Sequence, residues 1–325
     1  MGPLEIILIV IGIIFIIYLL IAIYQHHKLF GKRWDPDGII EYYSAFQYLD
    51  LMIEDVKFNL NNQTLRGYFY FYEKENYKGI LVFSHGMWGS HEAYIQEIEL
   101  LAREGYKVLG FDYLGTDLSD GKNIKGLGMS LRCLDAAIKY VKSISDEKIY
   151  VMGHSWGGFA ASNIAKYHND IAAVVAMSPF VSISRLLSKS APLLIKPFIP
   201  FFILIDWINC GTYSFSNSLK VLKKSNVPTL ILHSKDDHVV DYYKNTYVLE
   251  KRIKRNNLKF IILNGKKHNP DYSDDALQYA LECNKEMSQL KGEKLLIYRM
   301  KIDYQRMGEI DNNVFSKIID FLNNH

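Results

Sequence analysis

Short apolar runs alternate with stretches of helical spacing through most of this chain, and this alternation constrains the fold more than any other feature. Each run ends in polar or glycine residues, as strands buried on both faces of a parallel sheet commonly do. The runs are GILVFSHG (79–86), YKVLGFDY (106–113), KIYVMGHS (148–155), IAAVVAMSP (171–179), VPTLILHS (227–234) and LKFIILNG (258–265). The helical stretches between them cover residues 91–104, 130–143, 157–168 and 241–254. The sequence therefore predicts an α/β fold with a doubly wound, mostly parallel sheet.

Two segments depart from the alternation. Residues 51–73 hold two strand-like runs on either side of Asn61-Asn62-Gln63, which predicts an antiparallel hairpin ahead of the parallel strands. Residues 180–226 form an insertion between two strands, with an apolar stretch at 191–208 that raises the possibility of a membrane span. Prolines and charges argue against a span there, namely Pro192, Pro197, Pro200, Lys196 and Asp206. We therefore expect the insertion to form a helical cap over the sheet.

The amino terminus carries an uncharged apolar run of 19 residues, Ile6 to Tyr24. At about 1.5 Å per residue, a helix of this length spans roughly 29 Å, close to the hydrocarbon thickness of a bilayer. A cleaved signal peptide is the alternative, but it calls for a basic start, a shorter apolar region and a small-residue cleavage site. The sequence predicts a membrane anchor at 1–28, a juxtamembrane linker at 29–50 and one soluble domain at 51–325. The basic residues follow the span, which favours a cytoplasmic domain: Lys28, Lys32 and Arg33.

Charge and cysteine content exclude several kinds of protein. The 38 basic and 35 acidic residues give a formal charge of +3, which does not predict a nucleic-acid surface. The three cysteines have no paired spacing, so neither a disulfide framework nor a thiolate metal site is predicted. No metal and no organic cofactor is expected.

The chemistry is expected where strands end, because ligands of open α/β sheets bind at the carboxyl ends of the strands. The stretch VMGHSWGGFA places Ser155 between Gly153 and Gly157, after a predicted strand and before a predicted helix. This strand–turn–helix setting is what a nucleophile elbow needs, and glycines allow the close backbone approach of such a turn. An ordinary serine in a glycine-rich corner is the alternative.

A serine nucleophile needs a base and a carboxylate that orients the base. Of the ten histidines, His268 stands in a loop directly after the last apolar run, whereas we expect His154, next to the serine, to point away. Asp236 and Asp237 follow the preceding strand-like run and lie between Ser155 and His268 in the chain. The order Ser, Asp, His is the one expected for this kind of sheet.

Backbone N–H groups that stabilise an oxyanion are also expected near Ser155. Trp156, directly after the serine, is one predicted donor. The loop SHGMWGS at 84–90 supplies the other, with Met87 preferred and Trp88 as the alternative. A plain strand-to-helix turn is the competing interpretation of that loop.

Together these motifs resemble the α/β-hydrolase superfamily, in its serine esterase, lipase and aminopeptidase-like branch. The resemblance also includes GFDYLGTDLSDG (110–121) and covers most of the chain after residue 51. It implies that Asp237, three residues before a valine, is the acid rather than Asp236. It also implies that Asp112 braces its loop and takes no part in catalysis. Residues 269–311 are longer than in similar proteins, and their role is left open.

These features predict a membrane-anchored serine hydrolase with Ser155, His268 and Asp237 as a triad. The expected substrate is a small-molecule or lipid-like acyl ester or thioester. Two alternatives stay open: an aminopeptidase-like enzyme of the same fold, and a binding or scaffolding protein that has kept the fold without its activity.

Overall fold

The computed structural model describes residues 2–36, 42–190 and 193–325. Its centre is an eight-stranded sheet in the order β1-β2-β4-β3-β5-β6-β7-β8. The first two strands form the predicted antiparallel hairpin, β2 pairs antiparallel with β4, and the other pairs are parallel. The strands are β1 Met52–Leu60, β2 Gln63–Phe71, β3 Ile80–Ser84, β4 Lys107–Phe111, β5 Ile149–His154, β6 Ala173–Met177, β7 Thr229–Ser234 and β8 Leu258–Leu263. The predicted fold class is confirmed.

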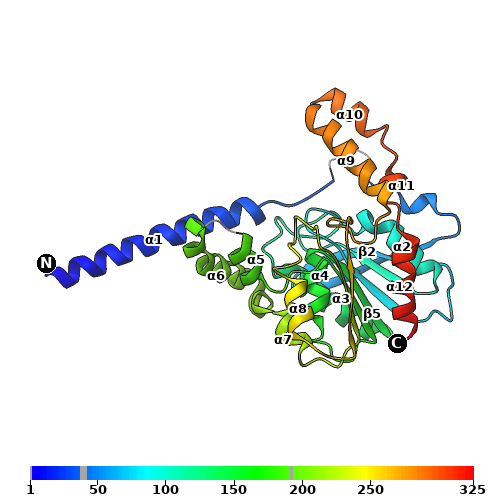
Figure 1. The fold of residues 1–325 in the computed structure, drawn as a ribbon, viewed down its shortest axis with the longest axis horizontal. Coiled ribbons are helices and arrows are strands. Elements are labelled where there is room, and N and C mark those ends of the chain that lie inside the picture. Colours follow the sequence, from blue (N-terminus) through cyan, green and yellow to red (C-terminus); the bar gives the residue numbers. More distant parts are fainter. Residues whose placement is uncertain (1, 37–41, 191–192) are drawn as a thin grey trace.

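Helices cover both faces of the sheet (Figure 1). On one face lie α3 Met129–Ile144, α4 Trp156–Ile164 and α8 Thr246–Arg252, whose apolar side chains join one buried core. On the other face lie α2 Ile95–Arg103, which follows the 3₁₀ helix η2 His91–Tyr94, and the carboxyl-terminal α12 Asn312–Asn323. Because both faces are covered, every residue of β3, β5, β6 and β7 is buried, which explains their unbroken apolar sequences.

Two helices are shorter than their sequence pattern predicts. The helix expected at 157–168 ends at Ile164, because the next residues turn tightly with a hydrogen bond from Tyr167 N–H to the Ile164 carbonyl. The helix expected at 241–254 begins only at Thr246, because the Asp241 carboxylate accepts the Lys244 N–H and closes a turn ahead of it. Local hydrogen bonds of this kind compete with the helix and are not visible in apolar spacing.

The insertion at 180–226 is helical, as expected. It consists of α5 Ile183–Ser190, η3 Leu193–Phe198, α6 Ile199–Cys210, η4 Gly211–Phe215 and α7 Ser218–Leu222. Pro197 lies inside η3 and Pro200 in the first turn of α6, whereas Pro192 lies outside the described residues. Residues Lys196–Leu222 have the length and composition of a membrane span, yet they are divided among several short helices.

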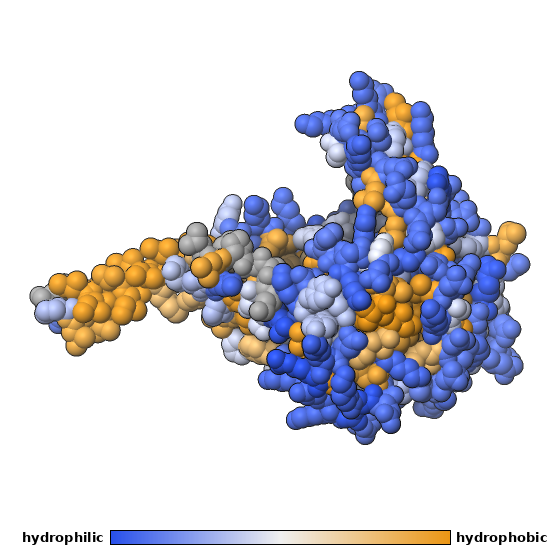
Figure 2. All heavy atoms as spheres, viewed as in Figure 1, coloured by the Kyte–Doolittle hydropathy of each residue, from blue (hydrophilic) through white to orange (hydrophobic). Residues whose placement is uncertain are grey.

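Two segments extend from the body in Figure 1. One is the helical extension α9 Asp274–Gln289, α10 Glu293–Arg299 and α11 Tyr304–Met307. The other is the long helix α1 Pro3–Phe30, long and apolar enough to cross a membrane. Figure 2 shows α1 as a hydrophobic rod beside a largely hydrophilic body. The expected linker at 29–50 includes a short 3₁₀ helix η1 Ala45–Gln47, and its residues 37–41 lie outside the described part of the chain.

Candidate active site

Ser155 occupies a sharp turn between β5 and α4. Its backbone has φ 57° and ψ −110°, a conformation that residues other than glycine rarely adopt. The flanking glycines allow this turn to pack against β3. A Cβ on Gly157 would overlap the carbonyl oxygen of Ser84, and a Cβ on Gly153 would meet the carbonyl oxygen of Gly157. Both positions therefore need glycine for the steric reason that the motif suggests.

The structure brings the side chains of Ser155, His268 and Asp237 together. The Nε2 atom of His268 lies 2.9 Å from the Ser155 hydroxyl oxygen, and its Nδ1 atom lies 2.8 Å from Oδ2 of Asp237. The three residues follow β5, β8 and β7, whose parallel pairing places their carboxyl ends along one edge of the sheet. The result is a continuous hydrogen-bonded path from hydroxyl to imidazole to carboxylate.

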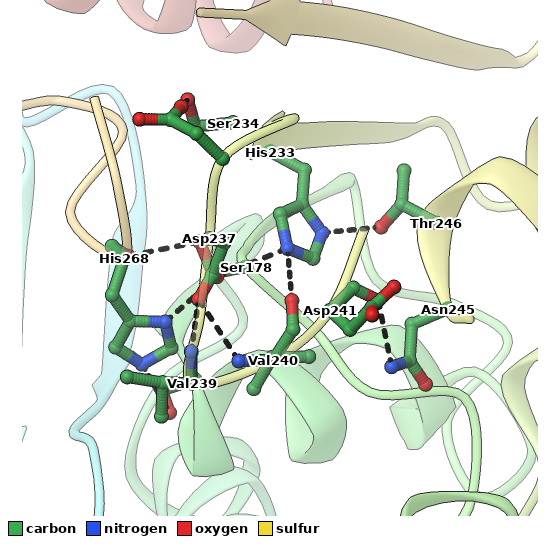
Figure 3. Close-up of polar contacts among 12 residues, drawn as sticks. Ser178, His233, Ser234, Asp237, Val239, Val240, Asp241, Asn245, Thr246 and His268 are labelled. Carbon is green, nitrogen blue, oxygen red and sulfur yellow. Dashed lines mark hydrogen bonds and ion pairs between the residues drawn. The ribbon is translucent and has the colours of Figure 1, made fainter. Parts of the chain in front are cut away.

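Asp237 is a buried carboxylate with several donors around it (Figure 3). Its Oδ1 accepts the backbone N–H groups of Val239 and Val240 at 2.8 and 2.9 Å. Burial opposes ionisation, but hydrogen bonds from His233 and His268 outweigh it and hold the pKa of Asp237 well below its ordinary value. Asp236 points elsewhere, accepting the Ser234 hydroxyl and the Gly265 N–H. The structure therefore places Asp237, and not Asp236, beside His268.

His233, which the sequence analysis did not single out, also contacts the acid. Its Nε2 lies 3.0 Å from Oδ2 of Asp237 and 2.8 Å from the Val240 carbonyl, and its Nδ1 lies 2.7 Å from the Thr246 hydroxyl. The side chain is fully buried at the end of β7. A histidine four residues before the acid, directly after the buried apolar residues 230–232, is the signal in the sequence that could have identified it.

The loop after β3 is held in place by buried hydrogen bonds. The Gly86 N–H donates to the Tyr94 hydroxyl at 3.1 Å, so this N–H is already used. His85 stacks on Tyr113, and burial lowers the pKa of His85 to about 4. Met87 follows in the same loop and is half-buried, whereas Trp88 is exposed with φ 60°.

Trp156 begins α4, and the first N–H groups of a helix have no partner within that helix. Its indole is buried and donates to the Leu127 carbonyl at 2.6 Å, which fixes the start of α4. The backbone N–H of Trp156 therefore belongs to a rigid segment directly beside Ser155.

His154 lies closer to the site than the sequence analysis expects. Its Nδ1 is 2.8 Å from the Tyr94 hydroxyl, and its Nε2 is 2.8 Å from the backbone carbonyl of His268. Burial and the neighbouring His268 lower the pKa of His154 to about 3, so the ring is neutral. Its Nε2–H then donates to His268 while Nδ1 accepts from Tyr94. The ring of His154 makes no hydrogen bond to Ser155 among the described contacts, but it joins two loops of the site.

Asp112 is a buried brace rather than a part of the hydroxyl–imidazole path. Its Oδ1 accepts the backbone N–H of His91 at 2.9 Å and lies 2.8 Å from Nδ1 of the same residue. Its Oδ2 accepts the Leu118 N–H, which fixes the loop after β4. Burial opposes ionisation of Asp112, but the charge and hydrogen bonds of His91 lower its pKa.

Within the described ranges, no group of three or more His, Cys, Asp or Glu side chains is arranged to hold a metal ion. The three cysteines are unpaired and buried. The arrangement around Ser155 can instead activate a hydroxyl group: the imidazole takes its proton and the carboxylate stabilises the imidazolium that forms.

The chain is similar to known hydrolases over part of its length. A family model described as "Serine aminopeptidase, S33" matches residues 75–203. The lysophosphatidylserine lipase ABHD12 of Danio rerio is 30% identical over 176 residues, which cover 50% of this chain and 44% of that protein. The chain therefore spans less than half the length of this curated relative.

Solved structures with low sequence identity share the fold. The esterase Pf2001 of Pyrococcus furiosus superposes with a TM-score of 0.57 at 20% identity, covering 79% of this chain and 97% of the esterase. Est1E of Butyrivibrio proteoclasticus, solved with ferulic acid bound, gives a TM-score of 0.54 at 20% identity, with 72% and 98% of the two chains covered.

Proposed function

We propose that this chain, which has the fold of the α/β-hydrolase superfamily, is a membrane-anchored serine hydrolase that cleaves an acyl ester or thioester. One observation carries the proposal. Ser155, on a strained turn, shares a hydrogen bond of 2.9 Å with His268, which in turn is 2.8 Å from the buried carboxylate of Asp237. A hydroxyl, an imidazole and a carboxylate in this order constitute an activated nucleophile.

The proposed reaction has two halves. Ser155 Oγ attacks the acyl carbonyl carbon while His268 Nε2 takes the hydroxyl proton, and His268 then gives this proton to the leaving alcohol or thiol. Water attacks the resulting acyl-enzyme, again losing a proton to His268, and the acid departs as Ser155 regains its proton. Asp237 stays ionised, consistent with its lowered pKa, and stabilises the imidazolium. Backbone N–H groups of Met87 and Trp156 bind the oxyanion, each worth about 2.7–4 kcal/mol in such sites.

A lipid-like monoester is the substrate class that we favour. The relative from Danio rerio is named a lysophosphatidylserine lipase, and the esterase neighbours share the fold. The hydrophobic helix α1 supports a membrane anchor, and an anchored enzyme meets substrates that reside in the bilayer. Basic residues that flank a span are enriched on its cytoplasmic side, and here they follow the span, so we expect the catalytic domain in the cytoplasm: Lys28, Lys32 and Arg33.

Labelling with a fluorophosphonate probe in detergent tests the nucleophile. We expect the full chain to label, Ser155→Ala to lose all labelling, and His268→Ala and Asp237→Asn to label at least a hundredfold more slowly. His238→Ala and Asp236→Asn are matched controls in the same loop and keep most of the rate, because neither side chain joins the path to Ser155. A folded wild type that fails to label favours a binding or scaffolding role.

The substrate class is tested with p-nitrophenyl acyl esters of increasing chain length beside aminoacyl amides. Ester hydrolysis that rises with acyl length supports the proposal. Faster cleavage of the aminoacyl amides identifies the aminopeptidase-like alternative instead, which the description of the matching family model keeps open.

Reporter fusions at the carboxyl terminus test the orientation separately. Activity of a reporter that works only in the cytoplasm supports a cytoplasmic domain. Activity of a reporter that works only outside the membrane contradicts it.

A further inference from the structure

One face of α1 is buried against the rest of the protein. Ala22, His26 and Phe30 follow one another at intervals of four residues and are only 1%, 5% and 3% exposed. Residues with this spacing lie on the same side of a helix. The ring of His26 packs against Phe202 of α6 at 4.9 Å between centroids, and Phe30 joins the larger core of the body. The anchor is therefore packed against the catalytic domain.

The residues after α1 fix the helix to the body in one position. The Trp34 N–H donates to the Gly115 carbonyl at 3.0 Å, and the Asp117 N–H donates to the Trp34 carbonyl at 3.0 Å. The Arg33 guanidinium binds carbonyls of the same loop, including that of Ser119 at 2.6 Å. A helix fixed by such contacts at its end cannot pivot freely with respect to the sheet.

The cap runs beside the part of α1 that belongs to the predicted span. Phe201 meets Phe15 at 4.9 Å between ring centroids, and Phe198 meets Tyr18 at 4.6 Å. Phe15 and Tyr18 lie six to nine residues before Tyr24, where the uncharged run ends. At about 1.5 Å per residue, this puts their level roughly 9–14 Å inside the boundary of the span. Whatever covers α1 at this level also surrounds the start of α6.

The exposed surface of this part of the cap is apolar. Leu193 in η3 is 78% exposed and Leu204 in α6 is 40% exposed, so neither is covered by the protein. Trp207 near the end of α6 is also partly exposed, and tryptophan is enriched where membrane meets water. Lys196 is charged and exposed in η3, but its long stem can carry the ammonium towards the interface.

The same segment is too firmly attached to the body to cross the membrane. The buried Asp206 carboxylate accepts the backbone N–H groups of Leu127 and Gly128 at 2.5 and 3.2 Å. This ties the second half of α6 to the soluble domain. The α6 helix has 12 residues and a length of roughly 18 Å, well short of a bilayer core.

We propose that η3 and the first half of α6 are embedded in the acyl-chain region of the bilayer beside α1, as a second membrane contact that enters one leaflet and returns. The inference rests on the proposed function, in which α1 is a membrane anchor, because the position of α1 in the membrane sets the depth of η3 and α6. The occupant of this apolar surface is lipid, since Phe198 and Phe201 lie level with the spanning part of α1.

Quenching of a fluorophore by brominated phosphatidylcholine in proteoliposomes tests this with the full chain. Single cysteines are introduced by Leu193→Cys and Leu204→Cys and labelled with bimane, and the native cysteines are buried. Ile13→Cys on α1 is the control for the anchor. Leu281→Cys on α9 is the matched control for an exposed leucine on a segment outside the proposed contact. Cooperative thermal unfolding of each variant checks that it is folded.

We expect the labels at Leu193, Leu204 and Ile13 to be quenched at least twofold more than the label at Leu281. If Ile13 is quenched while Leu193 and Leu204 behave like Leu281, α1 is in the bilayer but the cap remains in water, and the inference is overturned. If none of the four labels is quenched, α1 is not in the bilayer, and both the proposed anchor and this inference are wrong. Because quenching does not require turnover, a catalytically inactive but folded chain gives the same distinction.

Discussion

At the scale of single residues, Tyr94 and His154 connect two loops that the proposed reaction uses. The Tyr94 hydroxyl accepts the Gly86 N–H of the loop after β3, and His154 holds the backbone of His268. We expect Tyr94→Phe to lower kcat about tenfold, equivalent to about 1.4 kcal/mol, with KM unchanged, because both loops lose a shared partner. Ester hydrolysis at saturating and subsaturating substrate measures the two constants.

Tyr106→Phe is the matched control for Tyr94→Phe. It removes a hydroxyl that donates to Asn323, away from the site, at 3.1 Å. It should lower thermal stability slightly and leave kcat unchanged. Equal losses of kcat in the two variants would show that the effect of Tyr94 is only structural.

Two buried carboxyl groups, those of Glu97 and Asp271, should make the folded protein less stable as the pH rises. Both are only 1% exposed. Burial, and then the charge of Asp271, raises the pKa of Glu97 well above its ordinary value, while burial raises that of Asp271 to about 6. The folded protein thus holds protons that the unfolded chain releases near pH 4. The stabilisation that these bound protons provide is complete below about pH 4, and it is lost as the pH rises through the pKa values of the two carboxyl groups in the folded state.

We therefore expect Glu97→Gln to flatten the loss of stability between pH 5 and pH 8. One proton changes the slope by about 1.4 kcal/mol per pH unit over the range in which only the folded state holds it. Urea midpoints in detergent at several pH values measure this. Glu92→Gln, a neighbouring exposed glutamate, should keep the wild-type profile. Parallel profiles for wild type and Glu97→Gln would contradict the prediction.

At this scale, sequence reasoning finds the reacting side chains but not their supports. Ser155, Asp237 and His268 stand at strand ends in a known order, so their proximity could be predicted. Tyr94 and His154 are 60 positions apart in the chain, and no sequence spacing links the two. Their pairing depends on where η2 lies relative to the end of β5, which only the assembled fold determines.

At the scale of elements, Asp206 attaches α6 to the body. We expect Asp206→Ala to leave two buried N–H groups unpaired, at a cost of about 2–3 kcal/mol, and to loosen the cap more than the sheet. Limited trypsin digestion at Arg185 and Lys196, combined with thermal unfolding, measures this. The control Asp170→Ala removes an exposed ion pair with Lys142 instead, and it should change neither the digestion rate nor the unfolding temperature. Digestion at the wild-type rate in Asp206→Ala would argue against the attachment.

The strands could be predicted well because full burial imposes unbroken apolar runs, as in β6. Helix ends could not, since at Asp241 a side-chain hydrogen bond decides where α8 begins. The extension α9 to α11 was left open because its mostly exposed surface gives no sign of where it projects.

At the scale of the whole molecule, packing of α1 against the body contributes to the stability of the domain. Phe30 is 3% exposed and belongs to the main core, whereas Ile9 is an exposed residue of the same helix. We expect Phe30→Ala to destabilise the domain by about 3–5 kcal/mol in detergent and Ile9→Ala to leave it unchanged. Thermal unfolding followed by loss of fluorophosphonate labelling measures both. Equal unfolding temperatures for the two variants would mean that α1 is only a tether.

The fixed junction at Arg33 and Trp34 also bears on how the enzyme encounters its substrate. If α1 spans a membrane as proposed, a domain that cannot swing away from this helix samples a thin layer of lipid rather than a volume of solution. For an ester dissolved in that layer, the rate then follows its mole fraction among the lipids. Adding inert lipid at constant total ester would slow the reaction, although the amount of ester per litre has not changed.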